Sequence, residues 1–348
     1  MKLLVVITNY RVADLTIDCL HSIAKEIASV PGTHVAVCEN GTGDDSAERI
    51  SRAISENGWS VWCTLTAVDT NLGFTGGNNV LLRPALQSKD PPQYILLLNA
   101  DTIVKSNAFR ALVEFMDEHP KVGIAGSAQE FADGAPHRSA FRFHTPISEF
   151  EGHLKLGVIS RIFRKWTVAL PVSDQACEVD WTSGATMIIR REVFRDIGVL
   201  DEGYYTHFED TDFCFNARKA GWSTWYVPTS RIIHLAGQST GLTVKNPKRF
   251  PAYFFEARRR YFLKNHGAIY AAFADVGMIA GLSFWRLRTK LTGKEDFGAP
   301  HFLRDSIRHS VLFTGFALRE VQNPAMTSGS SRGDVKVPEE KERRLPVA

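Results

Sequence analysis

Residues 94–101 read Tyr-Ile-Leu-Leu-Leu-Asn-Ala-Asp, an apolar run that ends abruptly in polar side chains. A run of this length and character predicts a strand that is buried on both faces, as in a parallel sheet. Burying the carboxylate of Asp101 at the end of this strand is costly unless the carboxylate is paired or bound to a metal ion. By itself, Asp101 followed by Thr102 is better explained as a turn cap, so its interpretation depends on the rest of the chain.

Similar apolar runs alternate with helical patterns through the first two-thirds of the chain. We predict strands at Leu3–Ile7, His34–Glu39, Val61–Val68, Tyr94–Asn99, Val122–Ser127 and Thr186–Arg190. We predict helices at Asp14–Ala28, Asp45–Ile54, Gly76–Gln87 and Ser106–His119. This alternation indicates an α/β fold with a mostly parallel sheet covered on both faces. Ligands of such sheets bind outside the carboxyl ends of the strands, which here are Thr8-Asn9, Glu39-Asn40 and Asn99–Asp101.

Length and composition limit the classes of protein. The 348 residues suffice for one large α/β domain with an appendage, or for two domains. A formal net charge of +3 is too small to indicate a nucleic-acid partner. The five cysteines form no CxxC pair and are odd in number, so we expect reduced thiols in a cytosolic protein. The apolar run after Lys2 is too short for a signal peptide.

A second informative stretch is residues 71–79, Asn-Leu-Gly-Phe-Thr-Gly-Gly-Asn-Asn, which precedes a helical pattern. It is either a plain turn and helix cap, or a loop whose backbone approaches a phosphate or a sugar closely. It matches neither the GxGxxG fingerprint nor a Walker loop, so neither a dinucleotide enzyme nor an ATP hydrolase follows from it.

A third stretch is residues 208–213, Phe-Glu-Asp-Thr-Asp-Phe, which opens a helical pattern running to Ala220. Carboxylates at the start of a helix are ordinary, because they complement the helix dipole. Here aromatic residues surround them, and a carboxylate in a partly apolar, crowded acidic site is a candidate general base. His234 follows a short apolar strand. It is more often structural in such a place, but beside Asp101 it becomes a candidate second metal ligand.

The character of the sequence changes from about Gly237. The apolar stretch Ala268–Trp285 lies between the basic residues 258–260 and Arg286, Arg288 and Lys290. Asp275 within the stretch argues against a membrane span. Two interpretations have equal weight: a pair of core helices, or an interfacial helix with basic flanks that touches an anionic membrane. Asn323–Ala348 has almost no apolar residues and is predicted to be a disordered tail.

In their order along the chain, these segments resemble family 2 glycosyltransferases with the GT-A fold, in particular the bacterial rhamnosyltransferase-like branch. The resemblance covers roughly the first 265 residues, and the ordered set of motifs is far more specific than any one of them. The matching segments are 8–10, 39–41, 71–79, 99–102, 180–185 and 208–212, followed by His234, Gly237 and Ser239. The resemblance implies a GT-A catalytic domain over 1–240, with nucleotide-sugar binding in 1–127 and the acceptor and catalytic part in 128–240. A helical region at 241–322 and the tail at 323–348 follow.

The resemblance also implies roles for individual residues. Asp210 would be the catalytic base, with Glu209 and Asp212 supporting it or orienting the acceptor. Asp101 and His234 would hold a divalent cation, Mg²⁺ or Mn²⁺. The nucleotide-sugar pocket would comprise Thr8, Asn9, Glu39, Asn71, Gly73, Phe74, Asn78 and Asn99, and the donor sugar and acceptor would meet Trp181, Gly184 and Ala185.

The implied reaction is an inverting transfer of a sugar, with rhamnose suggested by the branch, from a dTDP- or UDP-sugar. The acceptor would be a saccharide or a lipid-linked molecule in cell-surface polysaccharide synthesis. The protein would be cytoplasmic, with peripheral contact to the inner face of the plasma membrane as an option, and would bind no nucleic acid.

Two alternative functions are weighed against this one. A sugar nucleotidyltransferase would need a phosphate loop rich in glycine and basic residues near the first strand, whereas residues 8–14 contain no glycine and only Arg11. A non-catalytic carbohydrate- or membrane-binding module derived from such an enzyme would be expected to have lost Asp101, Asp210 or His234, and all three are present.

Overall fold

The computed structural model describes residues 1–154, 161–235, 248–293 and 298–319. The amino-terminal part comprises β1 (Leu3–Asn9), α1 (Ala13–Ala24), η1 (Ile27–Ser29), β2 (Thr33–Asn40), α2 (Ser46–Glu56), η2 (Trp59–Val61), β3 (Cys63–Val68), α3 (Gly73–Leu86), β4 (Tyr94–Asn99), β5 (Thr102–Val104), α4 (Ala108–Glu118) and β6 (Val122–Glu130). The middle part comprises β7 (Pro136–His137), β8 (Ala140–Phe141), α5 (Pro146–Leu154), β9 (Cys177–Val179), β10 (Trp181–Thr182), β11 (Thr186–Arg190), α7 (Arg191–Ile197), α8 (Glu209–Lys219) and β12 (Ser223–His234). The last part comprises α9 (Ala252–Thr292), α10 (Phe302–Arg308) and α11 (Val311–Thr314).

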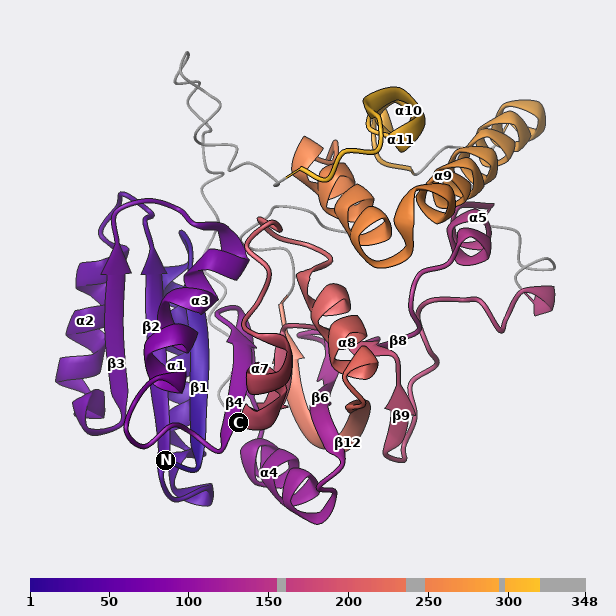
Figure 1. Ribbon diagram of the computed structural model, residues 1–348. Helices are drawn as coiled ribbons and strands as arrows, with labels where there is room; N and C mark the ends of the chain where they lie inside the picture. The colour runs from indigo at the N-terminus through magenta and orange to yellow at the C-terminus, as the bar shows by residue number, and fades with distance from the viewer. Residues whose placement is uncertain (155–160, 236–247, 294–297, 320–348) are drawn as a thin grey trace.

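The central sheet has the strand order β3-β2-β1-β4-β11-β6-β12-β5 (Figure 1). The strands β1 to β4 pair in parallel, as do β6 and β12. The strand β11 lies between β4 and β6 and is antiparallel to both. The predicted α/β fold with a mostly parallel, helix-covered sheet is therefore confirmed, and β11 and the short edge strands make it a mixed sheet.

Every predicted strand and helix is present, but some boundaries differ. The third strand begins at Cys63, because Val61 belongs to the short helix η2. The first helix ends at Ala24 and is followed by the 3₁₀ turn η1. The helix predicted from Gly76 begins at Gly73, so most of the stretch 71–79 is helix rather than loop. The predicted tail, and Gly237 and Ser239, lie outside the described residues.

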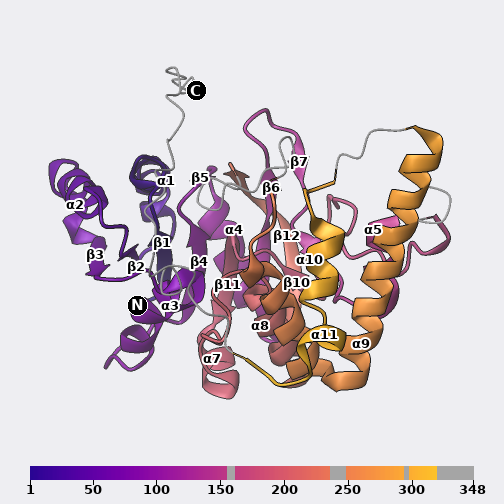
Figure 2. The same ribbon diagram turned by 90° about the horizontal axis from the view of Figure 1, so that it is seen from above.

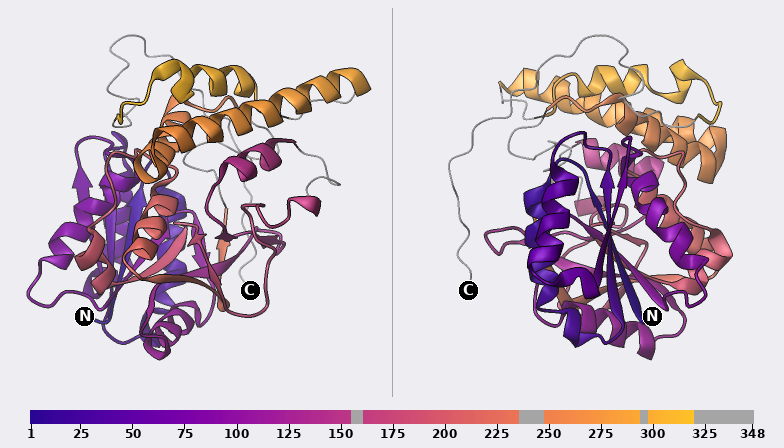
Figure 3. Two further views of the ribbon diagram at one scale, coloured as in Figure 1. Left: turned by 45° about the vertical axis from the view of Figure 1, so that its right-hand side comes forward. Right: turned by 90° about the vertical axis from the view of Figure 1, so that its left-hand side faces the viewer.

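The two faces of the sheet are covered by different helices, which explains why its strands are continuously apolar (Figure 3, right). In β1, Leu3, Val5 and Ile7 pack in a cluster that includes side chains of α1, α2 and α4. The alternate residues Leu4 and Val6 pack in a second cluster that includes side chains of α3, α7 and α8. A strand buried on both faces needs apolar residues at every position. All five cysteines are free thiols, as predicted.

The helix α9 crosses the carboxyl edge of the sheet and bends at Gly267, whose φ of 82° is not helical (Figures 1 and 2). Its first half packs against α8, with Tyr261 and Phe262 buried. Its second half packs against α5 through small residues. A Cβ on Gly277 would lie 2.5 Å from the carbonyl oxygen of Pro146, so only glycine permits this close approach.

A buried charge cluster holds α5 and both halves of α9 together. Arg258 donates from Nε to Glu149 of α5 at 2.7 Å and from Nη1 to Asp275 in the second half of α9. Asp275 also accepts the backbone N–H of Val311, at 2.7 Å. Asp275, the acidic residue that argues against a membrane span in the sequence, is thus buried and paired within the protein.

We expect Arg258→Ala to destabilise the fold by about 3–5 kcal/mol, because it leaves two carboxylates buried without their partner. Chemical denaturation monitored by circular dichroism would measure the loss. The matched control is Arg52→Ala, which removes an exposed ion pair with Glu48 and should cost under about 1 kcal/mol. Equal effects of the two substitutions would contradict a structural role for the buried cluster.

Candidate active site

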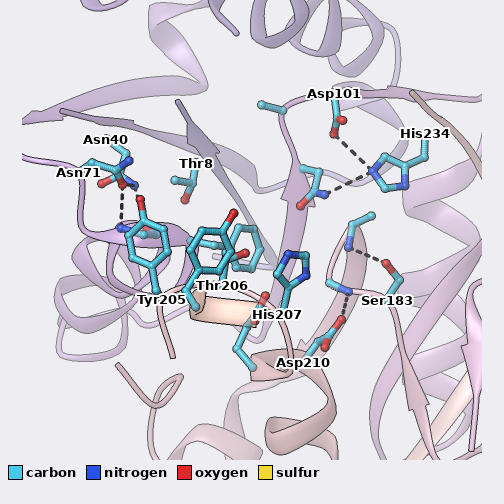
Figure 4. A pocket seen from close by; sticks show the side chains of 18 residues that line it. Thr8, Asn40, Asn71, Asp101, Ser183, Tyr205, Thr206, His207, Asp210 and His234 are labelled. Atoms are coloured by element: carbon cyan, nitrogen blue, oxygen red, sulfur yellow. Dashed lines mark hydrogen bonds and ion pairs between the residues drawn. The ribbon is translucent and has the colours of Figure 1, made fainter. Parts of the chain in front are cut away.

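A cavity of about 450 Å³ lies at the carboxyl ends of β1, β2 and β4 (Figure 4). It is lined by residues from the predicted set together with others. The predicted residues that line it are Thr8, Asn71, Gly73, Phe74, Asn99, Asp101, Gly184, Ala185, Glu209, Asp210 and His234. The lining residues outside that set are Asn40, Ala100, Ser183, Tyr205, Thr206, His207 and Tyr253.

One end of the cavity is formed by hydrogen bonds between the end of β2 and the start of α3. Asn40 accepts the N–H of Leu72 at 3.0 Å and donates to the carbonyl of Gly73 at 2.9 Å. Asn71 accepts the N–H of Gly73 at 2.8 Å. Gly73 has a φ of 73°, and a Cβ there would collide with the backbone of Tyr205. The sequence 71–79 therefore positions the first turn of α3 against the loop that leads into α8.

Four residues predicted for the pocket do not line this cavity and instead hydrogen-bond within the fold. Asn9 accepts from the hydroxyl of Thr16, Glu39 accepts the N–H of Thr42, Asn78 donates to the carbonyl of Phe74, and Trp181 donates to the carbonyl of Arg142. Their roles in binding a nucleotide sugar stay predictions.

Asp212, which was predicted to assist the base, also lies outside the cavity lining. Its carboxylate accepts hydrogen bonds from the hydroxyl of Tyr204 at 3.0 Å, from Lys264 at 2.7 Å and from Asn265 at 2.7 Å. These contacts tie α8 to the first half of α9. In this structure Asp212 contributes to the position of α8, one helical turn or less from the cavity.

Asp101 and His234 meet at the other end of the cavity. Nε2 of His234 lies 3.4 Å from Oδ1 of Asp101 and 3.4 Å from Nδ2 of Asn99. The pairing of β12 with β5, which sets His234 opposite Thr102, brings the two residues together. On the other side of the ring, Nδ1 lies 3.1 Å from Oε1 of Gln129. With the amide oxygen of Gln129 accepting at Nδ1, the tautomer that carries its proton on Nδ1 leaves the lone pair of Nε2 facing Asp101.

These groups fit a divalent cation. A carboxylate oxygen and an imidazole nitrogen point at one place, and Gln129 orients the imidazole as outer partners of metal ligands do. Oδ1 of Asn99 is buried and has no hydrogen-bond partner among the described residues. Mg²⁺ and Mn²⁺ take such oxygen ligands and share the remaining positions with substrate phosphates.

Glu209 and Asp210 open α8 at the edge of the cavity, after two residues of positive φ, His207 and Phe208. Asp210 accepts the N–H of Gly184 at 3.1 Å and the N–H of Thr211 at 2.7 Å. In Glu209, Oε2 has no hydrogen-bond partner among the described residues. The two neighbouring carboxylates therefore differ in their hydrogen bonds: Asp210 accepts two from the backbone, whereas Oε2 of Glu209 accepts none from the described residues.

Burial raises the pKa of both carboxyl groups above their ordinary values, and repulsion by Asp210 raises that of Glu209 further. The two backbone N–H groups oppose the rise at Asp210, because they stabilise its ionised form. The backbone N–H groups thus favour the ionised form at Asp210, whereas no such donors oppose the rise at Oε2 of Glu209 among the described residues. The assignment of Asp210 as the catalytic base stays a prediction.

Among the lining residues that were not predicted from the sequence are His207 and Tyr253. Burial lowers the pKa of His207 to about 4, so its ring is neutral, and its Nε2 has no partner among the described residues. Tyr253 belongs to α9, outside the segment predicted to be catalytic, and its ring stacks near that of His207. In the sequence, the aromatic residues around 204–208 pointed to this part of the cavity lining. No sequence pattern indicated that Tyr253 would line the cavity.

Comparison with known proteins agrees with this geometry. The profile of the family described as "Glycosyltransferase like family 2" matches residues 2–251. The chain belongs to glycosyltransferase family 2. The family predicted from the ordered motifs is thereby confirmed, and its profile spans all the strands of the sheet together with α8.

The curated relatives of this glycosyltransferase include rhamnosyltransferases. N-acetylglucosaminyl-diphospho-decaprenol L-rhamnosyltransferase of Mycobacterium tuberculosis is 28% identical over 224 residues, covering 62% of this chain and 66% of the relative. Rhamnosyltransferase WbbL of Escherichia coli is 29% identical over 168 residues, covering 47% of this chain and 61% of the relative. The match thus spans just under two thirds of the length of these relatives.

Solved structures confirm the GT-A fold of this glycosyltransferase. The mannosyltransferase PcManGT from Pyrobaculum calidifontis, solved with GDP-Man and Mn²⁺, superposes with a TM-score of 0.52 at 13% identity, covering 84% of this chain and 75% of that protein. At this identity the similarity establishes the fold alone.

Proposed function

We propose that this glycosyltransferase moves a sugar from a nucleotide diphosphate to the hydroxyl group of an acceptor, with inversion at the anomeric carbon. One observation carries the proposal. A single cavity holds a carboxylate that accepts two backbone N–H groups, at Asp210, and a carboxylate and an imidazole that face each other, at Asp101 and His234. A base for the acceptor and a place for the diphosphate are the two requirements of such a transfer.

The mechanism follows from the chemistry of the reacting groups. A sugar hydroxyl is a poor nucleophile at neutral pH, so Asp210 accepts its proton as the oxygen attacks the anomeric carbon. Attack comes from the face opposite the diphosphate, and the bond between the anomeric carbon and the phosphate oxygen breaks. One displacement inverts the anomeric centre, and no covalent intermediate with the protein forms. A cation held by Asp101 and His234 would supply positive charge to the departing diphosphate.

We assign the nucleotide sugar to the end of the cavity formed by Thr8, Asn71, Gly73 and Phe74, with its diphosphate toward Asp101. The glycine allows close approach of backbone. The donor sugar and the acceptor then meet beside Gly184 and Ala185, next to Asp210. Residues 1–127 would thus bind the donor and residues 128–240 would provide the acceptor side.

The names of the relatives favour particular substrates. Both are rhamnosyltransferases, and one acts on a lipid-linked diphosphate, by its name. We therefore propose a deoxyhexose donor such as dTDP-rhamnose, with a UDP-sugar as second choice, and a lipid-linked or saccharide acceptor. This chemistry belongs to cell-surface polysaccharide synthesis at the cytoplasmic face of the membrane.

A panel of nucleotide sugars tests the donor. With Mn²⁺ or Mg²⁺ present, we expect dTDP-rhamnose or a UDP-sugar at about 100 times its dissociation constant to stabilise the protein by about 2.7 kcal/mol. Thermal unfolding would detect this as a rise in Tm. The cation without nucleotide is the control. If no nucleotide sugar changes Tm, with or without the cation, the proposed donor site is wrong.

The activity should fall in acid at an unusually high pH for an aspartate base. Burial raises the pKa of Asp210, and only the ionised form accepts a proton, so the acid limb of kcat/KM should lie above the ordinary carboxyl value of about 4. The raised pKa itself stabilises the fold at acid pH, a contribution lost as the pH rises through it. Circular dichroism over the same range would check folding. A profile that stays flat down to about pH 4 would contradict the assignment.

A further inference from the structure

The second half of α9 carries a stripe of exposed apolar side chains. Its members are between 48% and 77% exposed and recur at intervals of three, four or eight residues, which places them on one face of a helix. They are Ile269, Phe273, Val276, Phe284, Leu287 and Leu291. Large apolar side chains scattered over a surface need no explanation, but a contiguous row on one element indicates a binding surface.

The opposite face of this half-helix is fixed to the protein. Ala274 and Met278 are buried, and Gly277 and Gly281 touch the backbone of α5. Asp275 is held by the buried guanidinium of Arg258. The half-helix therefore cannot rotate to hide its apolar stripe. It also cannot cross a bilayer as a free span, although α9 is long and apolar enough by length and composition, because protein covers one side of it.

A second group of exposed apolar side chains follows on and after α11, which packs against α9. Leu312, Phe313, Phe316 and Leu318 are between 51% and 72% exposed. The helices α9, α10 and α11 form the outermost layer over the carboxyl edge of the sheet (Figure 3, left). We call the stripe on α9 the apolar surface.

Along the second half of α9, from residue 268 to residue 292, the exposed and half-buried charges are of one sign. Between residues 268 and 292 the sole acidic residue is Asp275, which is buried and paired. The basic residues Arg286, Arg288 and Lys290 follow at the end of α9, and Arg288 lies over the ring of Trp285. An apolar face with Trp and basic residues at its border matches the chemistry of a membrane surface that contains anionic lipid.

We propose that the apolar surface binds an anionic bilayer with the second half of α9 lying in the plane of the interface. Phe273 and Phe284 enter the acyl boundary, while Arg288 and Lys290 contact lipid phosphates. The first half of α9 supplies Tyr253 to the cavity, so one element connects the membrane surface to the active site. This last link rests on the proposed function, because it concerns an acceptor anchored in lipid; the binding of the bilayer does not.

Co-sedimentation with vesicles tests the proposal on the full chain. We expect tight association with vesicles of phosphatidylcholine and phosphatidylglycerol and weaker association with phosphatidylcholine alone. The double variant Phe273→Asp/Phe284→Asp should weaken association at least about tenfold, because two large apolar side chains no longer enter the bilayer. The double variant Arg288→Gln/Lys290→Gln should weaken binding to the anionic vesicles alone, by about fivefold for each charge removed.

The control is Val61→Asp, which places one such charge at an apolar side chain that is 86% exposed on η2, outside the apolar surface. It should bind vesicles like the unmodified protein, and thermal unfolding should show that all variants are folded. Equal binding of Phe273→Asp/Phe284→Asp and the unmodified protein would overturn the proposal, as would absence of binding to anionic vesicles.

The same variants distinguish membrane binding from self-association of the chain through the apolar surface. If a second copy of the chain covers the apolar surface, light scattering will show a dimer that Phe273→Asp/Phe284→Asp converts to a monomer, with no binding to vesicles, and the membrane proposal is then wrong. Nucleotide binding in solution is measured separately. A protein that binds vesicles but no nucleotide sugar would retain the membrane surface and refute the proposed donor.

Discussion

Asp210→Asn is expected to lower kcat for sugar transfer by about 10²- to 10⁴-fold, the usual contribution of a general base. The asparagine oxygen can still accept the N–H of Gly184, so the local structure should persist. It cannot accept the proton of an attacking hydroxyl. Binding of the nucleotide should change little, because the donor diphosphate is assigned to the other end of the cavity.

Steady-state kinetics would measure kcat, and calorimetry would measure nucleotide binding. The matched control is Asp196→Asn, on α7, whose carboxylate accepts from Trp222 at the exposed surface; its turnover should be unchanged. Glu209→Gln provides the comparison within the pair. Near-normal turnover of Asp210→Asn, together with a larger loss in Glu209→Gln, would assign the base to Glu209 instead.

Asp101→Ala is expected to lower transfer by at least about 10²-fold and to weaken binding of Mn²⁺ in the presence of nucleotide. The reason is that the variant loses the carboxylate whose Oδ1 lies 3.4 Å from Nε2 of His234. Nucleotide should then bind with little dependence on Mn²⁺. Titration calorimetry with Mn²⁺ and nucleotide diphosphate would measure both effects without relying on activity.

Chelation tests the same prediction in the unmodified protein. Excess EDTA should abolish transfer, and Mn²⁺ or Mg²⁺ added afterwards should restore it. Asp133→Ala, in an exposed turn, is the control substitution and should leave the dependence on cation unchanged. Full activity in excess EDTA would exclude a cation from the mechanism.

In the structure, residues 268–285 belong to a helix with two different faces, and contact of the exposed face with a membrane stays a proposal. One face packs as a core helix against α5, and the other is apolar and exposed. Periodicity alone does not separate these faces, because both are apolar in sequence. The bend at Gly267 and the pairing of Arg258 with Asp275 decide which face is covered.

The start of α3 is a second place where the local sequence pattern does not predict the structure. Three glycines in residues 71–79 favour a loop by their intrinsic propensities. In the structure, Asn40 and Asn71 hold the first turn, and the N–H of Phe74 donates to the carbonyl of Tyr205 at 2.9 Å. Tertiary hydrogen bonds therefore extend the helix over residues that a local pattern assigns to a turn.

The sequence by itself determined the strand that leads to Asp101, the alternation of strands and helices, and the order of motifs that identifies the family. These depend on neighbours along the chain, whose spacing fixes which side chains share a face. The tertiary structure alone decided that His234 lies beside Asp101, that Gly184 donates to Asp210, and that Tyr253 reaches the cavity. Such contacts join residues far apart in sequence, so they depend on strand register and helix packing, which no local pattern specifies.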